Sequence, residues 1–193
     1  MTVKKKQYLI SFVGTDGSGK TTLAKELEAH LKVPVKYIYF GLKEFHISWL
    51  NSWVERQGDG GIFFRLVFLP IEYIIRQKKF PNYGIVILDR IPGWAFTGKS
   101  KLLFWMYKLI LPKTDLMVHC TGDPKLITKR KPDRSISECK KDLLKWEKVT
   151  QNYPSKKKLV LDTTIESIES CLLQLNSLVE DESNITSSRY KKY

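Results

Sequence analysis

The stretch GTDGSGKT, residues 14–21, decides the fold through its composition and its position in the chain. It fits the pattern G-x-x-x-x-G-K-[ST], which ends here on Lys20 and Thr21. An apolar run at residues 8–13 precedes it, and residues 22–31 carry leucines at helical spacing after it. The sequence therefore predicts a buried strand, a glycine loop and an amphipathic helix, in that order.

A glycine loop at the start of a helix has the chemistry of a phosphate site. Glycines allow successive backbone N–H groups to point at phosphate oxygens, and the helix dipole favours negative charge there. Lys20 would reach the β- and γ-phosphates, and the Thr21 hydroxyl would be a ligand of Mg²⁺. We therefore expect ATP and Mg²⁺ as cofactors. The residues that we assign to cofactor binding are Gly14, Asp16, Gly17, Ser18, Gly19, Lys20, Thr21 and Thr22.

The rest of the chain alternates strand-like apolar runs with helical patterns, which is typical of parallel α/β architecture. The predicted strands are 8–13, 35–40, 85–88, 116–120 and 158–161. The predicted helices are 20–32, 45–56, 62–79, 100–111, 124–131, 136–151 and 165–179. We expect one three-layer α/β/α domain over residues 1–180, with a central parallel five-stranded sheet, and a polar C-terminal tail over 181–193.

Composition excludes several other classes of protein. The 193 residues suit one domain, and 42% hydrophobic and 27% charged residues are ordinary globular values. Three cysteines without ligand spacing predict neither a disulfide framework nor a zinc site, and they favour a cytoplasmic location. The apolar segments 62–75 and 102–111 are short and interrupted by charges, so we expect buried or interface helices and no membrane span.

The net charge of +13 is the unusual bulk property of the chain. Its lysines are scattered in short runs, and no run alternates with aromatic residues as in a nucleic-acid-binding module. We therefore expect a small-molecule partner and no nucleic acid. Binding of small phosphates explains only part of this charge.

Two further clusters carry chemistry. Asp89 and Arg90 directly follow the apolar run 85–88, at the strand end where parallel sheets bind ligands. Asp89 would hold Mg²⁺ directly or through water, and Arg90 would contact phosphate oxygens; the alternative is a salt-bridged loop pair. The segment KRKPDR, residues 129–134, would close over the phosphates as a lid, and its alternative is a solvated charged face.

Together these residues resemble the thymidylate kinase family of nucleoside monophosphate kinases over most of the chain. The matching segments are residues 14–21, 88–90, 95–98, 130–134 with Glu138, and 161–164. The resemblance implies a P-loop kinase fold with a small helical lid at about 123–137, a homodimer, and phosphoryl transfer from ATP to dTMP. It also implies that Asp16 faces the sugar of the acceptor nucleotide.

The resemblance also implies where the catalytic arginine lies. Some family members place it in the phosphate loop, whereas others have glycine there and supply an arginine from the lid. Gly17 occupies that loop position, so Arg130 or Arg134 is the expected charge-stabilising residue. With Lys20 and Arg90 they complete the predicted catalytic set. No general base is needed, because the acceptor is already an anionic phosphate.

The acceptor side departs from the family. The expected Arg-x-Pro-Gly-Gly motif is replaced by YFGLKEF at residues 39–45, and no Phe-x-x-x-Arg spacing occurs in 62–79. Arg65 or Arg76 would substitute for the phosphate contact, and Phe64 or Phe68 for base stacking. Three functions therefore stay open: a thymidylate or closely related kinase, a kinase with another nucleotide, a nucleoside, or a sugar or lipid phosphate as acceptor, and a nucleotide-binding protein without turnover.

Overall fold

The computed structural model describes residues 7–41 and 64–188, together with residues 45, 47, 49 and 52. Its centre is a five-stranded sheet in the order β2-β3-β1-β4-β5, with every neighbouring pair parallel. The strands are β1 (Gln7–Gly14), β2 (Val35–Tyr39), β3 (Gly84–Asp89), β4 (Thr114–Thr121) and β5 (Ser155–Asp162). This confirms the predicted parallel five-stranded sheet.

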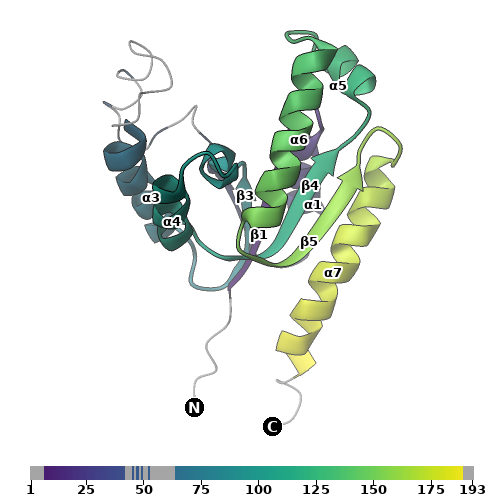
Figure 1. Ribbon diagram of the computed structural model, residues 1–193. Coiled ribbons are helices and arrows are strands. Elements are labelled where there is room, and N and C mark those ends of the chain that lie inside the picture. Colours follow the sequence, from purple (N-terminus) through teal and green to yellow (C-terminus); the bar gives the residue numbers. More distant parts are fainter. Residues whose placement is uncertain are drawn as a thin grey trace.

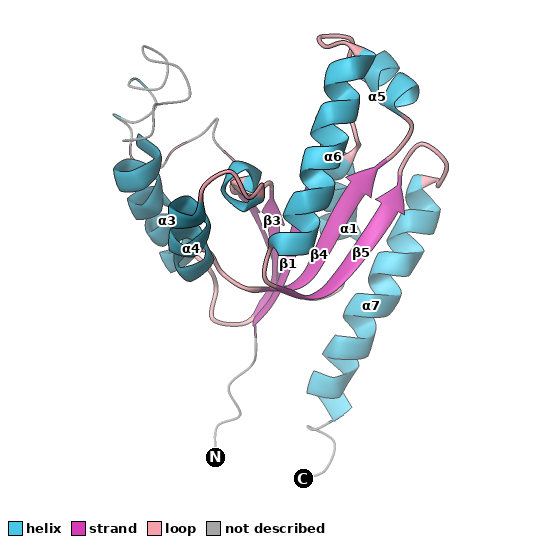
Figure 2. Ribbon diagram, viewed as in Figure 1, coloured by secondary structure: helices cyan, strands magenta, loops and turns pink. Residues whose placement is uncertain are grey.

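Helices cover both faces of the sheet (Figures 1 and 2). The helices on one face are α1 (Lys20–His30) and α7 (Ile168–Ser188). Those on the other face are α3 (Leu69–Lys78), α4 (Lys101–Ile110) and α6 (Ile136–Asn152). The short helix α5 (Pro124–Arg130) lies beyond the end to which the strand arrows point, where α6 begins. The three-layer α/β/α architecture is therefore confirmed.

Alternate side chains of each central strand enter opposite cores, as the period of a strand requires. In β1, Leu9 and Val13 pack among side chains of α3, α4 and α6. Ile10 and Phe12 instead pack with leucines of α1 and α7. Because β1 is buried on both faces, it reads as a continuous apolar run in the sequence.

Several helix boundaries differ from the predicted ones. The predicted helix 45–56 lies largely outside the described residues, and a π-helix (Phe64–Phe68) precedes α3. The helix expected at 165–179 begins at Ile168, because Ile165 is in a turn that bonds back to Asp162 and the Ser167 hydroxyl caps the helix. It continues to Ser188, into the segment expected as tail.

Within the described part of the chain, we find no helix that is both long enough and apolar enough to cross a bilayer.

A fully buried ion pair lies within α3, and its arginine also binds the loop after β2. The side chains of Glu72 and Arg76 are 0% exposed, and Arg76 Nε lies 2.7 Å from Glu72 Oε1. Arg76 also donates a hydrogen bond from Nη1 to the Gly41 carbonyl at 2.8 Å. The suggested role of Arg76 as a substrate contact is therefore wrong in this structure, because its guanidinium is enclosed in the core.

We predict that Arg76→Leu lowers the free energy of unfolding by about 3–5 kcal/mol, because it leaves the Glu72 carboxylate buried without its partner. The double variant Glu72→Leu/Arg76→Leu should recover part of this loss, since it removes both charges together. Urea denaturation of the two single variants and the double variant measures the coupling. Strictly additive losses would contradict the prediction.

Candidate active site

The phosphate loop occupies the turn between β1 and α1, and its backbone path needs glycine at both ends. A Cβ on Gly14 would lie 2.2 Å from the Cys120 carbonyl oxygen of the neighbouring strand. Gly19, directly before α1, has φ 74°, in the left-handed region that favours glycine. The loop backbone is therefore free of side-chain bulk where a phosphate would approach the start of the helix.

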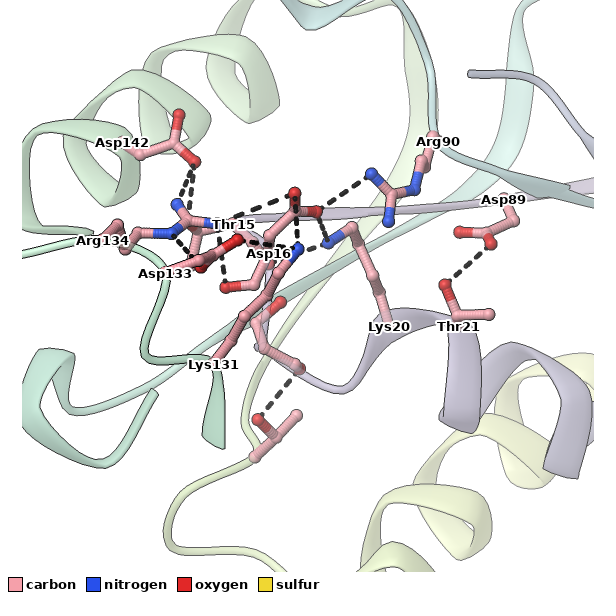
Figure 3. Close-up of polar contacts among 12 residues, drawn as sticks. Thr15, Asp16, Lys20, Thr21, Asp89, Arg90, Lys131, Asp133, Arg134 and Asp142 are labelled. Carbon is pink, nitrogen blue, oxygen red and sulfur yellow. Dashed lines mark hydrogen bonds and ion pairs between the residues drawn. The ribbon is translucent and has the colours of Figure 1, made fainter. Parts of the chain in front are cut away.

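Thr21 and Asp89, the two predicted metal ligands, lie in contact. The Thr21 hydroxyl donates a hydrogen bond to Asp89 Oδ2 at 2.8 Å (Figure 3), and the Tyr37 hydroxyl donates to the same oxygen at 2.6 Å. Asp89 Oδ1 is buried and has no hydrogen-bond partner among the described residues. A hydroxyl oxygen beside an uncommitted carboxylate oxygen is a donor set that suits Mg²⁺, so the residues present fit this ion.

Asp16 is surrounded by four cationic side chains. Its carboxylate oxygens lie 2.9 Å from Arg90, 3.3 Å from Lys20, 3.4 Å from Lys131 and 3.7 Å from Arg134 (Figure 3). Lys131 also pairs with Asp133 and Arg134 with Asp142, whereas Lys20 and Arg90 share Asp16 as their ion-pair partner among the described residues. The excess of positive charge therefore lies at Lys20 and Arg90. Such a cluster attracts a polyanion such as a triphosphate.

The charged groups in this cluster shift one another's pKa values. Burial by itself would raise the pKa of Asp16, but Lys20, Arg90 and Lys131 together hold that pKa far below its ordinary value. Burial, and secondarily Arg90, lowers the pKa of the Lys20 ammonium. An incoming phosphate would favour the charged form of Lys20, because it places a negative charge beside a desolvated cation.

The two predicted lid arginines have different surroundings. Arg134 donates to the Thr15 hydroxyl at 2.8 Å and lies 3.4 Å from Asp142, so it belongs to the cation cluster. Arg130 points to the other side of the loop and donates to the Thr163 carbonyl at 2.8 Å. The sequence left these two residues equivalent, whereas the structure separates them.

Three residues of the site were missed by sequence reasoning: Tyr37, Lys131 and Asp142. Asp142 accepts a hydrogen bond from the Thr15 hydroxyl at 2.6 Å and so ties α6 to the phosphate loop. A sequence signal existed for it, because Asp142 follows Glu138 by one helical turn on the lid helix. Lys131 lay inside the predicted lid but was not singled out there.

Two cavities meet at the phosphate loop. The larger, of about 610 Å³, lies between the ends of β2 and β3 and α6 with the segment before it, and Tyr39, Trp94 and Trp146 are among its walls. The smaller, of about 420 Å³, lies over the start of α1, with Arg130 and Thr163 among its walls. Lys20 and Arg90 line both cavities. A group passed from one cavity to the other would therefore remain in contact with both cations.

The remaining predicted cofactor residues are also at the loop. Gly17, Gly19, Thr21 and Thr22 line the smaller cavity, whereas Gly14 and Asp16 line the larger one. Ser18 is buried, and its hydroxyl has no hydrogen-bond partner among the described residues. The suggested stacking residue Phe64 is only 1% exposed, so it belongs to the core, and the side chain of Arg65 lies outside the described residues.

Comparison with solved structures identifies the fold. Thymidylate kinase from Candida albicans superposes with a TM-score of 0.64 at 24% identity, over 93% of each chain. The YorR protein of Bacillus subtilis, solved with phosphorylated GDP, gives 0.59 at 21% identity, over 91% of this chain and 98% of that one. Deoxyadenosine kinase from M. mycoides, solved with bound dATP, gives 0.54 at 17%, over 89% and 98%. The chain therefore has a thymidylate kinase-like P-loop kinase fold.

No protein-family model matches the chain, and a search of curated proteins finds no significant match. The solved structures therefore confirm the resemblance to thymidylate kinases at the level of the fold.

We predict that Asp16→Asn lowers stability at neutral pH, because it leaves four cations without their shared carboxylate. The folded-state pKa of Asp16 is depressed, so its contribution is fully present above the ordinary value of 3.8 and declines only as the pH falls below it. The difference in unfolding free energy between wild type and variant should be constant from pH 8 to about pH 4.5 and shrink below.

Urea denaturation across this pH range measures the difference. Asp133→Asn is the control, since Asp133 is 59% exposed and also neighbours Lys131 and Arg134; it should change stability little. A wild-type advantage that disappears between pH 6 and pH 5 would contradict the depressed pKa.

Proposed function

We propose that the protein is an ATP- and Mg²⁺-dependent kinase that transfers a phosphoryl group to a nucleoside monophosphate, with dTMP as the first candidate acceptor. The observation that carries this proposal is the position of Lys20 and Arg90 in the walls of both cavities. Phosphoryl transfer needs two substrates whose phosphates meet at a cationic point shielded from water.

Each part of the site has a role in this reaction. The loop amides and Lys20 bind the donor phosphates, and Thr21 and Asp89 hold Mg²⁺, which supplies charge neutralisation on the phosphate oxygens when it is bound. Arg90 and Arg134 stabilise the negative charge that spreads over the transferred group. Asp16 holds these cations at the transfer point. It lines the larger cavity, which we assign to the acceptor (the acceptor cavity), and the smaller one is then the donor cavity.

A kinase with a different acceptor is the second candidate. Tyr39 lies at the end of β2 in the wall of the acceptor cavity, in the segment where the family motif would supply an arginine. Arg76 is enclosed in the core and cannot replace it there. The fold is also found in a deoxyadenosine kinase and in a protein solved with phosphorylated GDP. Other nucleotides and a nucleoside are therefore included in the test, and a sugar or lipid phosphate remains the alternative if none of them is phosphorylated.

The domain organisation and the location of the protein belong to the same proposal. We infer one kinase domain over residues 1–180, with a lid at about 123–137 that contains α5 and the start of α6, and a cytoplasmic location. Free, buried Cys120, Cys139 and Cys171 are consistent with a reducing compartment.

The two lid arginines give the first test. In a coupled ADP-release assay with Mg-ATP and a panel of dTMP, dUMP, UMP, CMP, AMP, GMP and thymidine, Arg134→Ala should lower kcat about 10²- to 10³-fold. Arg130→Ala should mainly raise the KM for ATP, by about tenfold, because it contacts the rim of the donor cavity.

Lys125→Ala, an exposed lysine of α5, is the matched control, and Lys20→Ala should abolish turnover. Turnover on dTMP would support the first candidate, and turnover on another member of the panel the second. Tight ATP binding without turnover on any member of the panel would point to an acceptor outside the nucleotides, such as a sugar or lipid phosphate, or to a binding protein without turnover.

A homodimer is the second testable part of the proposal. Leu102, Trp105 and Leu109 of α4 are 66%, 58% and 83% exposed and lie on one side of the helix. Ile71 and Ile74 add exposed apolar surface on α3, which packs beside α4 (Figure 1). Exposed apolar side chains on two helices that pack together favour association with a second copy.

Light scattering should give a mass twice the 22.5 kDa of one chain, and Leu109→Lys should reduce it toward that of the monomer. Leu173→Lys on α7, where Leu173 is 71% exposed, should leave the mass unchanged. A wild-type mass of one chain would contradict the dimer.

A further inference from the structure

The two oxygens of the Asp89 carboxylate have unequal surroundings. Oδ2 accepts hydrogen bonds from both the Thr21 and the Tyr37 hydroxyls, whereas Oδ1 is buried without a hydrogen-bond partner in the described part of the chain. The carboxyl torsion of an aspartate is broad, and the two oxygens of the carboxylate are chemically equivalent. An arrangement that satisfies one oxygen twice and leaves the other uncommitted therefore has a specific cause in the surrounding residues.

The cause is the register between β2 and β3. Tyr39 pairs with Asp89, and Tyr37 pairs with Ile87, so Tyr37 lies two residues behind Asp89 on the adjacent strand. Side chains two residues apart share one face of a sheet, and Tyr37 and Ile87 both contact the core under α1. The phenol therefore extends along this face until its hydroxyl meets the Asp89 carboxylate.

The two donors act on the metal site together. Thr21 alone could follow a rotating carboxylate, because its hydroxyl is free to turn. A second donor from a different element removes that freedom, since the Tyr37 ring is partly buried between the sheet and α1. The hydroxyl proton of Thr21 then points to Oδ2, and its oxygen lone pairs remain available on the other side.

We propose that Tyr37 is a positioning residue for the divalent-metal site: it fixes the Asp89 carboxylate so that Oδ1 and the Thr21 oxygen are presented together as ligands. The proposal rests on the proposed function, in which a metal–nucleotide complex binds at this loop. Tyr37 itself does not touch the metal or the nucleotide.

A fixed carboxylate orientation should matter more for the affinity of a small cation than for that of a large one. Mg²⁺ demands near-octahedral geometry at short distances, whereas Ca²⁺ accepts variable geometry and ligand number. Loss of the Tyr37 hydroxyl should therefore weaken Mg²⁺ more than Ca²⁺. This difference separates positioning from a general loss of structure, which would weaken both cations and the nucleotide alike.

The experiment compares wild type, Tyr37→Phe and Tyr153→Phe. Tyr153 is the matched control, because its buried hydroxyl also donates one hydrogen bond, to the Pro112 carbonyl at 2.7 Å, away from the phosphate loop. Binding of a fluorescent ADP analogue is measured in EDTA and then titrated with MgCl₂ and, separately, with CaCl₂. Electron paramagnetic resonance of Mn²⁺ with ADP gives a direct metal readout.

For Tyr37→Phe we expect metal-free ADP affinity within about twofold of wild type and a half-saturating Mg²⁺ concentration about tenfold higher. The half-saturating Ca²⁺ concentration should change less than about threefold, and the Mn²⁺ spectrum should broaden. Tyr153→Phe should match wild type in all these measurements, even if its melting temperature falls.

Equal Mg²⁺ dependence in wild type and Tyr37→Phe would overturn the inference while leaving the proposed function intact. Parallel losses of Mg²⁺, Ca²⁺ and metal-free ADP binding would also overturn it, because they indicate a structural role. If nucleotide binding by the wild-type protein did not depend on Mg²⁺, there would be no metal site. Both the proposed function and the role of Tyr37 would then be overturned.

Discussion

The accumulation of positive charge around the end of β1 is the constraint on which the rest of the site depends. Lys20 is only 3% exposed and lies among further cations, an arrangement that is unfavourable without negative charge nearby. Asp16 supplies that charge from within the loop, while Arg134 and Lys131 approach it from the lid. The Asp16 carboxylate thus links the loop, residues 131–134 and the end of β3.

Contacts of Thr15 add a second link between the phosphate loop and α6 with the segment before it. Asp142 and Arg134 both contact Thr15, so α6 is tied to a loop residue beside Asp16. A phosphate entering the cluster would compete with Asp16 for the same cations. The contacts of these cations to Asp16 would then be exchanged for contacts to the phosphate.

The fold and the loop side of the site could be predicted from the sequence, because both are encoded by local patterns. The strand, glycine loop and helix at 8–31, and the Asp89-Arg90 pair after an apolar run, need no knowledge of distant residues. Tyr37 and Asp142 could not be found in this way, because their roles depend on strand register and helix packing. The prediction that Arg76 contacts a substrate phosphate was wrong because its burial also depends on helix packing. Glu72, one turn earlier, was a visible signal of an ion pair.

β5 lies at the edge of the sheet, and this position gives part of the net positive charge an effect that is unrelated to phosphate binding. An edge strand exposes unpaired backbone groups that can recruit a strand from another molecule, and lysines on such a strand oppose this pairing. β5 begins with three exposed lysines, Lys156, Lys157 and Lys158, directly after its first residue. Lys156 pairs with Asp115, so two copies brought edge to edge would oppose Lys157 and Lys158 of each chain, and this charge opposes aggregation in a concentrated solution.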